Sequence, residues 1–166
     1  MPLKIRRFKP EDLPALHKLL SDPEVMRFLE PPFSLKKSTE FLQSAGLADS
    51  PLVYAVENAN QDFIGYVIYH PYDSASMEIG WVLLPAFQKK GYAKELTRQL
   101  VEKAHARELD AILECVSQQK ATIHIAQTFG FRPEGMQDGC LVFRHAAKDT
   151  QFGWPGKQEK QEEMKR

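Results

Sequence analysis

Apolar positions along this chain follow two periods, one typical of strands and one typical of helices. Short apolar or alternating runs predict strands at 3–8, 52–57, 63–70, 77–84, 111–116, 131–137 and 140–145. Apolar residues at helical spacing predict helices over 13–20, 22–29, 35–46, 92–107 and 122–128. A strand followed by a helix and another strand, as over 77–116, favours a right-handed crossover and at least one parallel strand pair.

Polar residues and glycines mark the ends of these elements. Asp22 and Ser34 are predicted N-caps of the second and third helices, and Gly130 is expected to end the last one. The connection 58–62 has hairpin chemistry, and Asp138 with Gly139 between two apolar runs is a strong hairpin signal. Residues 1–147 are therefore expected to form one domain, followed by a polar tail or extra helix at 148–166.

Composition limits the class of protein. The 166 residues are 43% hydrophobic, which suits a single well-filled core. Lysine and arginine together balance aspartate and glutamate, giving a formal net charge of zero, which argues against a general nucleic-acid surface. No segment is long and apolar enough to predict a membrane span, so we expect a cytoplasmic protein with no membrane partner.

Cysteine and histidine offer little chemistry by their spacing. Cys115 and Cys140 both lie in strand-like runs of a chain without a signal peptide, which favours two reduced thiols in the core. The five histidines are scattered and no His or Cys pair has zinc-ligand spacing, so we expect no metal site.

A small, basic turn at 84–93 carries the clearest functional signal. It follows the run 77–84 and precedes the helix at 92–107, whose first N–H groups lack backbone partners and lie at the positive end of the helix dipole. Gly91 allows close approach to the main chain, while Lys89, Lys90, Lys94 and Arg98 add positive charge. The turn suits a pyrophosphate, although an ordinary strand-to-helix turn with a solvated basic face has the same residues.

The pattern Gln88-x-x-Gly91-x-Ala93 resembles the acetyl-CoA pyrophosphate signature of the GNAT acyltransferase superfamily. The predicted element order is also that of the GNAT fold. Segments 22–29, 77–83 and 129–131 resemble the ribosomal-protein alanine N-acetyltransferase-like branch. The resemblance implies a single-domain α/β fold: a mostly antiparallel, twisted sheet with a central splayed parallel pair and helices on both faces.

The resemblance also implies where acetyl-CoA binds. The main chain of the strand before the turn would hold the pantetheine arm, as an added strand would, and the turn would hold the pyrophosphate. The cofactor residues expected on this basis are Val82, Leu83, Leu84, Gln88, Lys89, Lys90, Gly91, Tyr92, Ala93, Lys94, Gln119 and Thr122.

Direct acetyl transfer to an amine needs a base and a proton donor for the leaving thiolate. Glu78 is the first candidate base because it lies among Met77, Ile79 and Trp81 on the strand expected to line the cleft, although an exposed strand glutamate would have the same pattern. His70, expected to end the preceding strand, is the second candidate.

The proton donor departs from the family pattern. Many members carry a tyrosine four residues before the Gly of the final Gly-Phe, and here that position is Ala126. The branch typically has Asn-x-x-Ser at the start of this helix, and alignment places Gln119 and Thr122 there. Thr122 could donate the proton, or it could simply cap the helix.

The sequence thus predicts an acetyl-CoA-dependent N-acetyltransferase whose acceptor is a protein N-terminus or a small amine. A catalytically weak acyl-CoA-binding regulatory or interaction module is the alternative, motivated by Ala126 and Gln119. A phosphate-binding enzyme unrelated to CoA is a third hypothesis. Edge strands and the aromatic residues of the tail would allow a homodimer.

Overall fold

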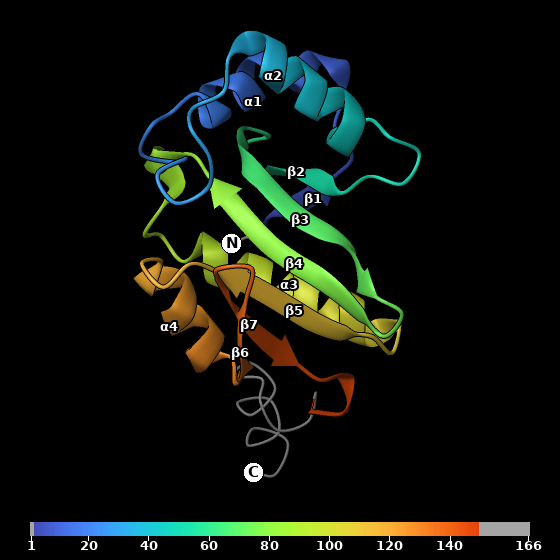
Figure 1. Ribbon diagram of the computed structural model, residues 1–166. Helices are drawn as coiled ribbons and strands as arrows, with labels where there is room; N and C mark the ends of the chain where they lie inside the picture. Colours follow the sequence, from blue (N-terminus) through green and yellow to red (C-terminus); the bar gives the residue numbers. More distant parts are fainter. Residues whose placement is uncertain (1, 150–166) are drawn as a thin grey trace. The chain divides into compact units, whose positions relative to one another are not determined.

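The computed structural model describes residues 2–149 (Figure 1). The strands are β1 (Lys4–Arg6), β2 (Val53–Glu57), β3 (Phe63–Asp73), β4 (Ser76–Leu83), β5 (Asp110–Cys115), β6 (Arg132–Gln137) and β7 (Cys140–His145). The α-helices are α1 (Leu13–Leu20), α2 (Leu35–Phe41), α3 (Tyr92–Ala106) and α4 (Lys120–Thr128). Short 3₁₀ turns are present at Pro10–Asp12, Pro85–Phe87 and Ala147–Asp149, and α2 continues into a π-helical turn at Leu42–Gly46.

The seven strands form one sheet in the order β1-β2-β3-β4-β5-β7-β6. The sheet is mostly antiparallel with one parallel pair, which confirms the predicted fold class. The described residues divide into two compact units. Strands β3 and β4 each contribute residues to both units. The first unit holds residues 2–70 and 79–99, and the second holds 71–78 and 100–149.

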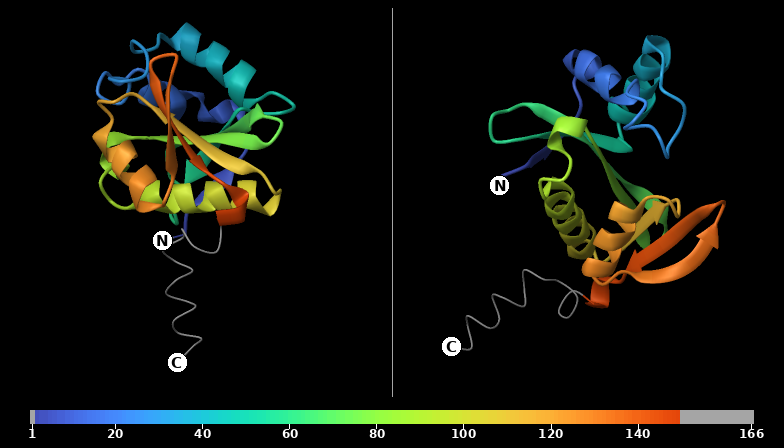
Figure 2. Two further views of the ribbon diagram at one scale, coloured as in Figure 1. Left: turned by 60° about the horizontal axis from the view of Figure 1, so that its bottom comes forward. Right: turned by 90° about the vertical axis from the view of Figure 1, so that its left-hand side faces the viewer.

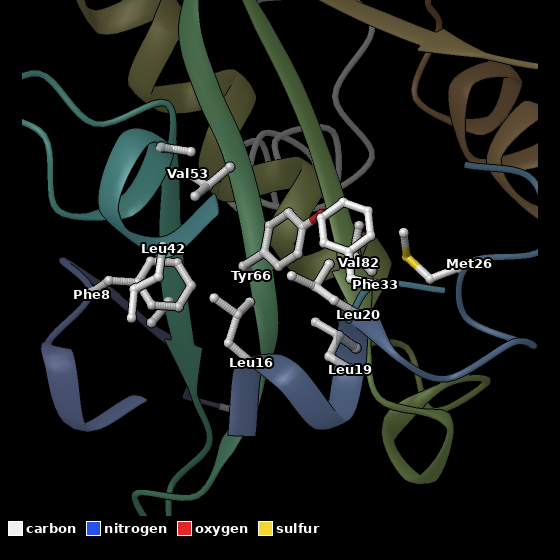
Figure 3. Packing of buried hydrophobic residues seen from close by; sticks show 12 residues of the cluster. Phe8, Leu16, Leu19, Leu20, Met26, Phe33, Leu42, Val53, Tyr66 and Val82 are labelled. Atoms are coloured by element: carbon white, nitrogen blue, oxygen red, sulfur yellow. The ribbon is translucent and has the colours of Figure 1, made fainter. Parts of the chain in front are cut away.

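The core of the first unit lies between its helices and its strands. In α1, Leu16, Leu19 and Leu20 point to the sheet because residues three and four apart share one helical face. They join side chains from β2, β3 and β4 in one buried cluster, part of which is drawn in Figure 3. Figure 2 shows α1 and α2 side by side above the strands of this unit.

The segment after α1 differs from its prediction. Asp22 does act as a cap, since its Oδ1 accepts from the N–H groups of Glu24 at 2.8 Å and Val25 at 3.2 Å. The predicted helix over 22–29 is wrong, because the chain forms a series of hydrogen-bonded turns there. Capping supplies only the first hydrogen bonds of a helix. The bonds that follow here differ in span: Met26 N–H donates four residues back to Asp22 O, and Leu29 N–H donates three residues back to Met26 O, so no continuous helical series forms.

Two other element limits differ from their predictions. The strand expected to end at His70 continues through Pro71 to Asp73, so His70 lies inside β3. Proline is compatible with a strand where no N–H is needed for pairing. The last helix begins at Lys120 with Gln119 as its N-cap, so Thr122 belongs to the first turn and the capping alternative for it is wrong.

The second unit contains the hairpin and the last helix. Asp138 and Gly139 both have positive φ, 51° and 81°, as a tight hairpin turn requires, which confirms the signal in the sequence. Helix α4 ends in a Schellman motif: Gly130 has φ 76°, its N–H donates to Gln127 O at 3.1 Å, and Phe131 N–H donates to Ala126 O at 2.9 Å.

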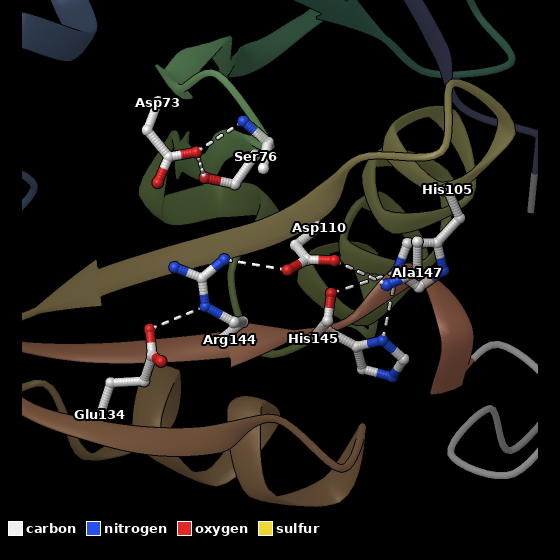
Figure 4. A network of polar contacts seen from close by, with 9 residues as sticks. Asp73, Ser76, His105, Asp110, Glu134, Arg144, His145 and Ala147 are labelled. Carbon is white, nitrogen blue, oxygen red and sulfur yellow. Dashed lines mark hydrogen bonds and ion pairs between the residues drawn. The ribbon is translucent and has the colours of Figure 1, made fainter.

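A polar network ties strands of the second unit together (Figure 4). The Arg144 guanidinium donates to Asp110 Oδ2 at 2.9 Å and to Glu134 Oε1 at 2.8 Å, linking β5, β6 and β7. The other oxygen of Asp110 accepts from Ala147 N at 2.9 Å. This hydrogen bond ties the segment that follows β7 to Asp110 of β5.

Within residues 2–149, no helix is long and apolar enough to cross a membrane. Cys115 is buried and Cys140 half-buried, and both are free thiols. Burial raises the pKa of the Cys115 thiol, and the nearby Cys140 raises it further. The predicted tail, apart from its first two residues, lies outside the described part of the chain.

Candidate acyl-donor site and catalytic residues

The turn between β4 and α3 has an unusual backbone. Lys89 has φ 58° and Gly91 has φ 85°, so two residues with positive φ alternate with their neighbours just before the helix. Turns that combine positive and negative φ are the kind of backbone in which successive N–H groups can line an anion-binding concavity. Residues 88–91 are exposed, and a lysine rarely adopts positive φ without a structural reason.

Helix α3 adds further donors to the same turn. Its hydrogen-bond ladder starts with Glu95 N–H donating to Gly91 O at 3.2 Å. The N–H groups of Tyr92, Ala93 and Lys94 therefore have no carbonyl to donate to within the helix. The side chains of Lys89, Lys90 and Lys94 are exposed around them. Backbone donors, the helix dipole and these lysines together form a cradle that fits a pyrophosphate.

The strand end before the turn is held by specific bonds. Gln88 Nε2 donates to Leu83 O at 3.0 Å, and Leu84 N–H donates to Ile64 O on β3 at 2.9 Å. The Val82 carbonyl faces Gly65, where a Cβ would lie only 2.1 Å from the Val82 oxygen. Gln88, the first residue of the family pattern, is thus a brace between turn and strand.

These bonds refine the prediction for Val82, Leu83 and Leu84. The Leu84 N–H and the Leu83 carbonyl already have protein partners, so neither group is fully available to a ligand acting as an added strand. Val82 and Leu83 are buried and Leu84 is half-buried. Their role toward the pantetheine arm stays a prediction.

Glu95 stabilises the first turn of α3. Its carboxylate accepts from Arg98 Nε at 3.1 Å, and Gln99 Nε2 lies 3.1 Å from Glu95 Oε1. The Arg98 guanidinium holds the pKa of Glu95 below its ordinary value, against the opposing effect of partial burial. Arg98, expected to add charge at the turn, is therefore partly neutralised by Glu95.

The candidate catalytic residues fall in different units. His70 is half-buried in the first unit, on β3. Glu78 is half-buried on β4 in the second unit, between the buried residues Met77 and Ile79. The alternation buried, half-buried, buried confirms that Glu78 is not a fully exposed strand residue.

The surroundings of Glu78 include two residues that the sequence did not single out. The pKa of the Tyr72 hydroxyl is raised by lost solvation, by a hydrogen bond with Glu114 and by the charges of Glu114 and Glu78. The Tyr72 hydroxyl also donates to Gln137 Oε1 at 3.0 Å. Glu114 on β5 is thus a second carboxylate in the neighbourhood of Glu78. The sequence contained no signal for it, because the pairing depends on strands far apart along the chain.

The start of α4 carries the remaining candidates, also in the second unit. Gln119 uses its side chain locally: its Oε1 accepts from Val116 N–H at 2.9 Å. Thr122 is half-buried in the first turn of α4, and no hydrogen bond of its hydroxyl is found within residues 2–149. By contrast, the Thr97 and Thr128 hydroxyls each donate to the carbonyl four residues back. Ala126 is fully buried in the core.

Comparison with known proteins supplies the family. Residues 3–132 match the family described as the Acetyltransferase (GNAT) domain. The uncharacterized N-acetyltransferase YnaD of Bacillus subtilis (strain 168) is 26% identical over 144 residues, which cover 84% of each chain.

Two solved structures share the fold. An acetyltransferase of the GNAT family from Bacillus anthracis superposes with a TM-score of 0.77 at 22% identity, over 89% of this chain and 96% of that one. The spermidine N-acetyltransferase of Vibrio cholerae, solved in complex with CoA and spermine, gives a TM-score of 0.71 at 22% identity, over 86% and 92% of the two chains.

Proposed function

The chain belongs to the GNAT acetyltransferase family, and we propose that it moves an acetyl group from acetyl-CoA to a primary amine by direct attack within a ternary complex. Acetyl-CoA is the acyl donor of this family and supplies an activated thioester carbonyl. The observation that carries the proposal is the turn before α3, where alternating φ and exposed lysines suit a pyrophosphate.

Within this proposal, Lys89, Lys90, Gly91, Tyr92, Ala93 and Lys94 bind the pyrophosphate, and Gln88 braces the turn through Leu83. The strand end at 82–84 orients the acyl arm through whichever main-chain groups remain available. The amine acceptor is a small molecule or a protein N-terminus. The ribosomal-protein alanine branch, a cytoplasmic location and a homodimer stay predictions.

Glu78 is the proposed general base, because a half-buried carboxylate can take a proton from the attacking ammonium. We expect Glu78→Gln to lower kcat about 100-fold or more while the KM for acetyl-CoA stays within about twofold. Glu114→Gln and His70→Gln are the matched controls, since each changes another titratable candidate. If either control lowers kcat as much as Glu78→Gln does, the base is assigned wrongly.

Thr122 is the proposed donor to the leaving thiolate, with solvent water as the alternative. We expect Thr122→Ala to lower kcat about tenfold, since a positioned donor contributes at least that much. Thr128→Ala is the matched control, because the Thr128 hydroxyl already donates to His124 O. Equal activity of Thr122→Ala and wild type would assign the proton to water.

The whole proposal is tested by incubating the protein with acetyl-CoA and a panel of primary amines and following thiol release. Release that depends on both amine and protein supports it. A catalytically weak acyl-CoA-binding module is favoured by Ala126, which is fully buried and offers no hydroxyl where many relatives have one. Tight CoA binding by calorimetry, without thiol release for any amine of the panel, would favour the binding module over the enzyme.

A further inference from the structure

In the first unit, a lysine side chain covers an aromatic ring beside a carboxylate. The Lys37 ammonium lies 4.3 Å from the centroid of the Phe33 ring. It also pairs with Glu30 Oε1 at 3.3 Å. A cation held between an aromatic face and a carboxylate is the arrangement by which proteins recognise alkylammonium groups.

The ring that Lys37 covers is fixed in place. Phe33 is buried, and its N–H donates to Leu20 O at 2.8 Å at the end of α1. Its ring packs edge-on against Phe41 at 6.1 Å, and Phe41 in turn packs against Tyr66 at 5.6 Å. The aromatic surface is therefore rigid, whereas Glu30 and Lys37 have half-exposed side chains.

This place is continuous with the strand expected to hold the acyl arm. Phe33, Tyr66 and Val82 belong to one buried cluster, and in Figure 3 the Tyr66 hydroxyl points to the side of Phe33 and Val82. Burial, and then the charge of Glu30, raise the pKa of Tyr66. The negative charge of Glu30 thus reaches the Tyr66 hydroxyl, which is the end of Tyr66 that points to the side of Phe33. This hydroxyl stays protonated at neutral pH.

We propose that Glu30 and the face of Phe33 bind a second ammonium group of the acceptor, and that Lys37 fills this subsite when no acceptor is bound. This inference rests on the proposed acetyl transfer. The amine that attacks must lose its proton, so a cation that stays bound at Glu30 belongs to another part of the acceptor. The shared chemistry is an alkylammonium, carried by a diamine or polyamine or by a lysine near a peptide N-terminus.

The energetics allow exchange. An exposed ion pair contributes little to stability, and an exposed cation over a ring contributes about as little, so Lys37 is a weak occupant. A ligand ammonium replaces it with the same two contacts. Removing the lysine therefore removes a competitor without removing the subsite.

The test compares acceptors that differ by one ammonium. Steady-state KM and kcat are measured with propane-1,3-diamine and propylamine, and with tripeptides that carry lysine or norleucine at the second position. We expect Lys37→Met to lower the KM of the ligands with the extra ammonium about threefold to tenfold, and Glu30→Gln to raise it as much. The KM of the partner ligands that lack this second ammonium, and all kcat values, should stay within about twofold. The pair of ligands that responds identifies the source of the ammonium.

Lys36→Met and Glu24→Gln are matched controls, since each removes an exposed charge of the same sign from the same region. Unchanged KM values in Lys37→Met and Glu30→Gln, or equal changes for ligands with and without the second ammonium, would overturn the subsite while leaving acetyl transfer intact. Calorimetric binding of propane-1,3-diamine to the CoA-loaded protein needs no turnover. It therefore tests the subsite separately, even if no amine is acetylated.

Discussion

Two strand-to-helix junctions of this protein use their helix N-termini differently. Before α3, the backbone alternates in φ, the N–H groups of 92–94 remain without helical partners, and lysines surround them. Before α4, the side-chain Oε1 of Gln119 accepts from the Val116 N–H. The backbone N–H of Gln119 donates to Val116 O at 3.0 Å. The first junction leaves helix N–H groups without helical partners, whereas at the second the side chain of Gln119 accepts from the Val116 N–H.

The largest expected effect concerns the strand that leads into the first junction. Gly65→Ala would place a Cβ 2.1 Å from the Val82 carbonyl oxygen, which the backbone can relieve only by moving β4. We expect the free energy of unfolding to fall by about 3 kcal/mol or more. Gly135→Ala is the control, since Gly135 also has positive φ, 93°, but no atom lies within 4 Å of its added Cβ. Equal urea midpoints for the two variants would contradict the packing argument.

The next effect concerns the first junction itself. Gly91→Val places a β-branched residue at φ 85° and should lower CoA affinity about tenfold, because the turn must distort to relieve about 1–2 kcal/mol of strain. Gly139→Val tests strain alone, since Gly139 has φ 81° in the hairpin turn. Calorimetry with CoA compares the two. A similar loss of affinity in Gly139→Val would mean that general destabilisation, not the turn, controls binding.

A smaller effect is expected at the second junction. Gln119→Ala leaves the Val116 N–H without its side-chain acceptor, which should lower the free energy of unfolding by about 1 kcal/mol. Gln118→Ala is the control, because the Gln118 side chain is exposed and, within residues 2–149, its only hydrogen bond is the one that its Oε1 accepts from Ser117 Oγ at 3.4 Å. Urea titration measures both. If Gln119→Ala instead weakens CoA binding and leaves stability unchanged, the junction has the cofactor role that the sequence assigned to Gln119.

The smallest effect depends on pH. The pKa of Glu95 is lowered in the folded protein, so its carboxylate stabilises the fold above the ordinary value of 4.5, and this stabilisation is lost as the pH falls through the lowered pKa. Glu95→Gln should therefore reduce the free energy of unfolding at pH 7 by less than about 1 kcal/mol. The difference from wild type should shrink as the pH falls through the lowered pKa of Glu95. A difference that grows as the pH falls would contradict the prediction that Glu95 loses its stabilising effect on protonation.

Local signals predicted the elements well wherever neighbouring residues complete the hydrogen bonds themselves. Ser34 caps α2 by accepting from Lys37 N at 3.1 Å, and Gly139 completes the hairpin turn with positive φ. The same logic failed at 22–29, because Asp22 supplies a cap but the residues after it form turns. A cap is a condition for a helix, and the packing of the following residues decides whether one forms.

The candidate site was predicted in its backbone more than in its side chains. Gln88, Gly91 and Ala93 pointed to the turn before α3, which has two residues with positive φ and exposed lysines; its role toward a pyrophosphate stays a prediction. Tyr72 and Glu114 near Glu78 were missed. Tyr72 lies close to Glu78 in the sequence, but Glu114 comes from β5, and only the folded sheet brings its carboxylate to Tyr72. The contact between Lys37 and Phe33 was missed for a related reason. A lysine four residues after a phenylalanine is common, and only the folded structure shows that Glu30 and packed aromatic rings surround this pair.

By itself, and apart from the helix wrongly predicted at 22–29, the sequence determined the order of strands and helices, the turns between them and the basic turn that suits a pyrophosphate. These depend on φ preferences, capping and apolar spacing, which adjacent residues encode. Only the tertiary structure decided that Gln88 braces Leu83, that the Leu84 amide is already paired, and that Lys37 rests on Phe33 beside Glu30. Those contacts join side chains and backbone groups whose meeting depends on how separate elements pack, and local preference does not specify that geometry.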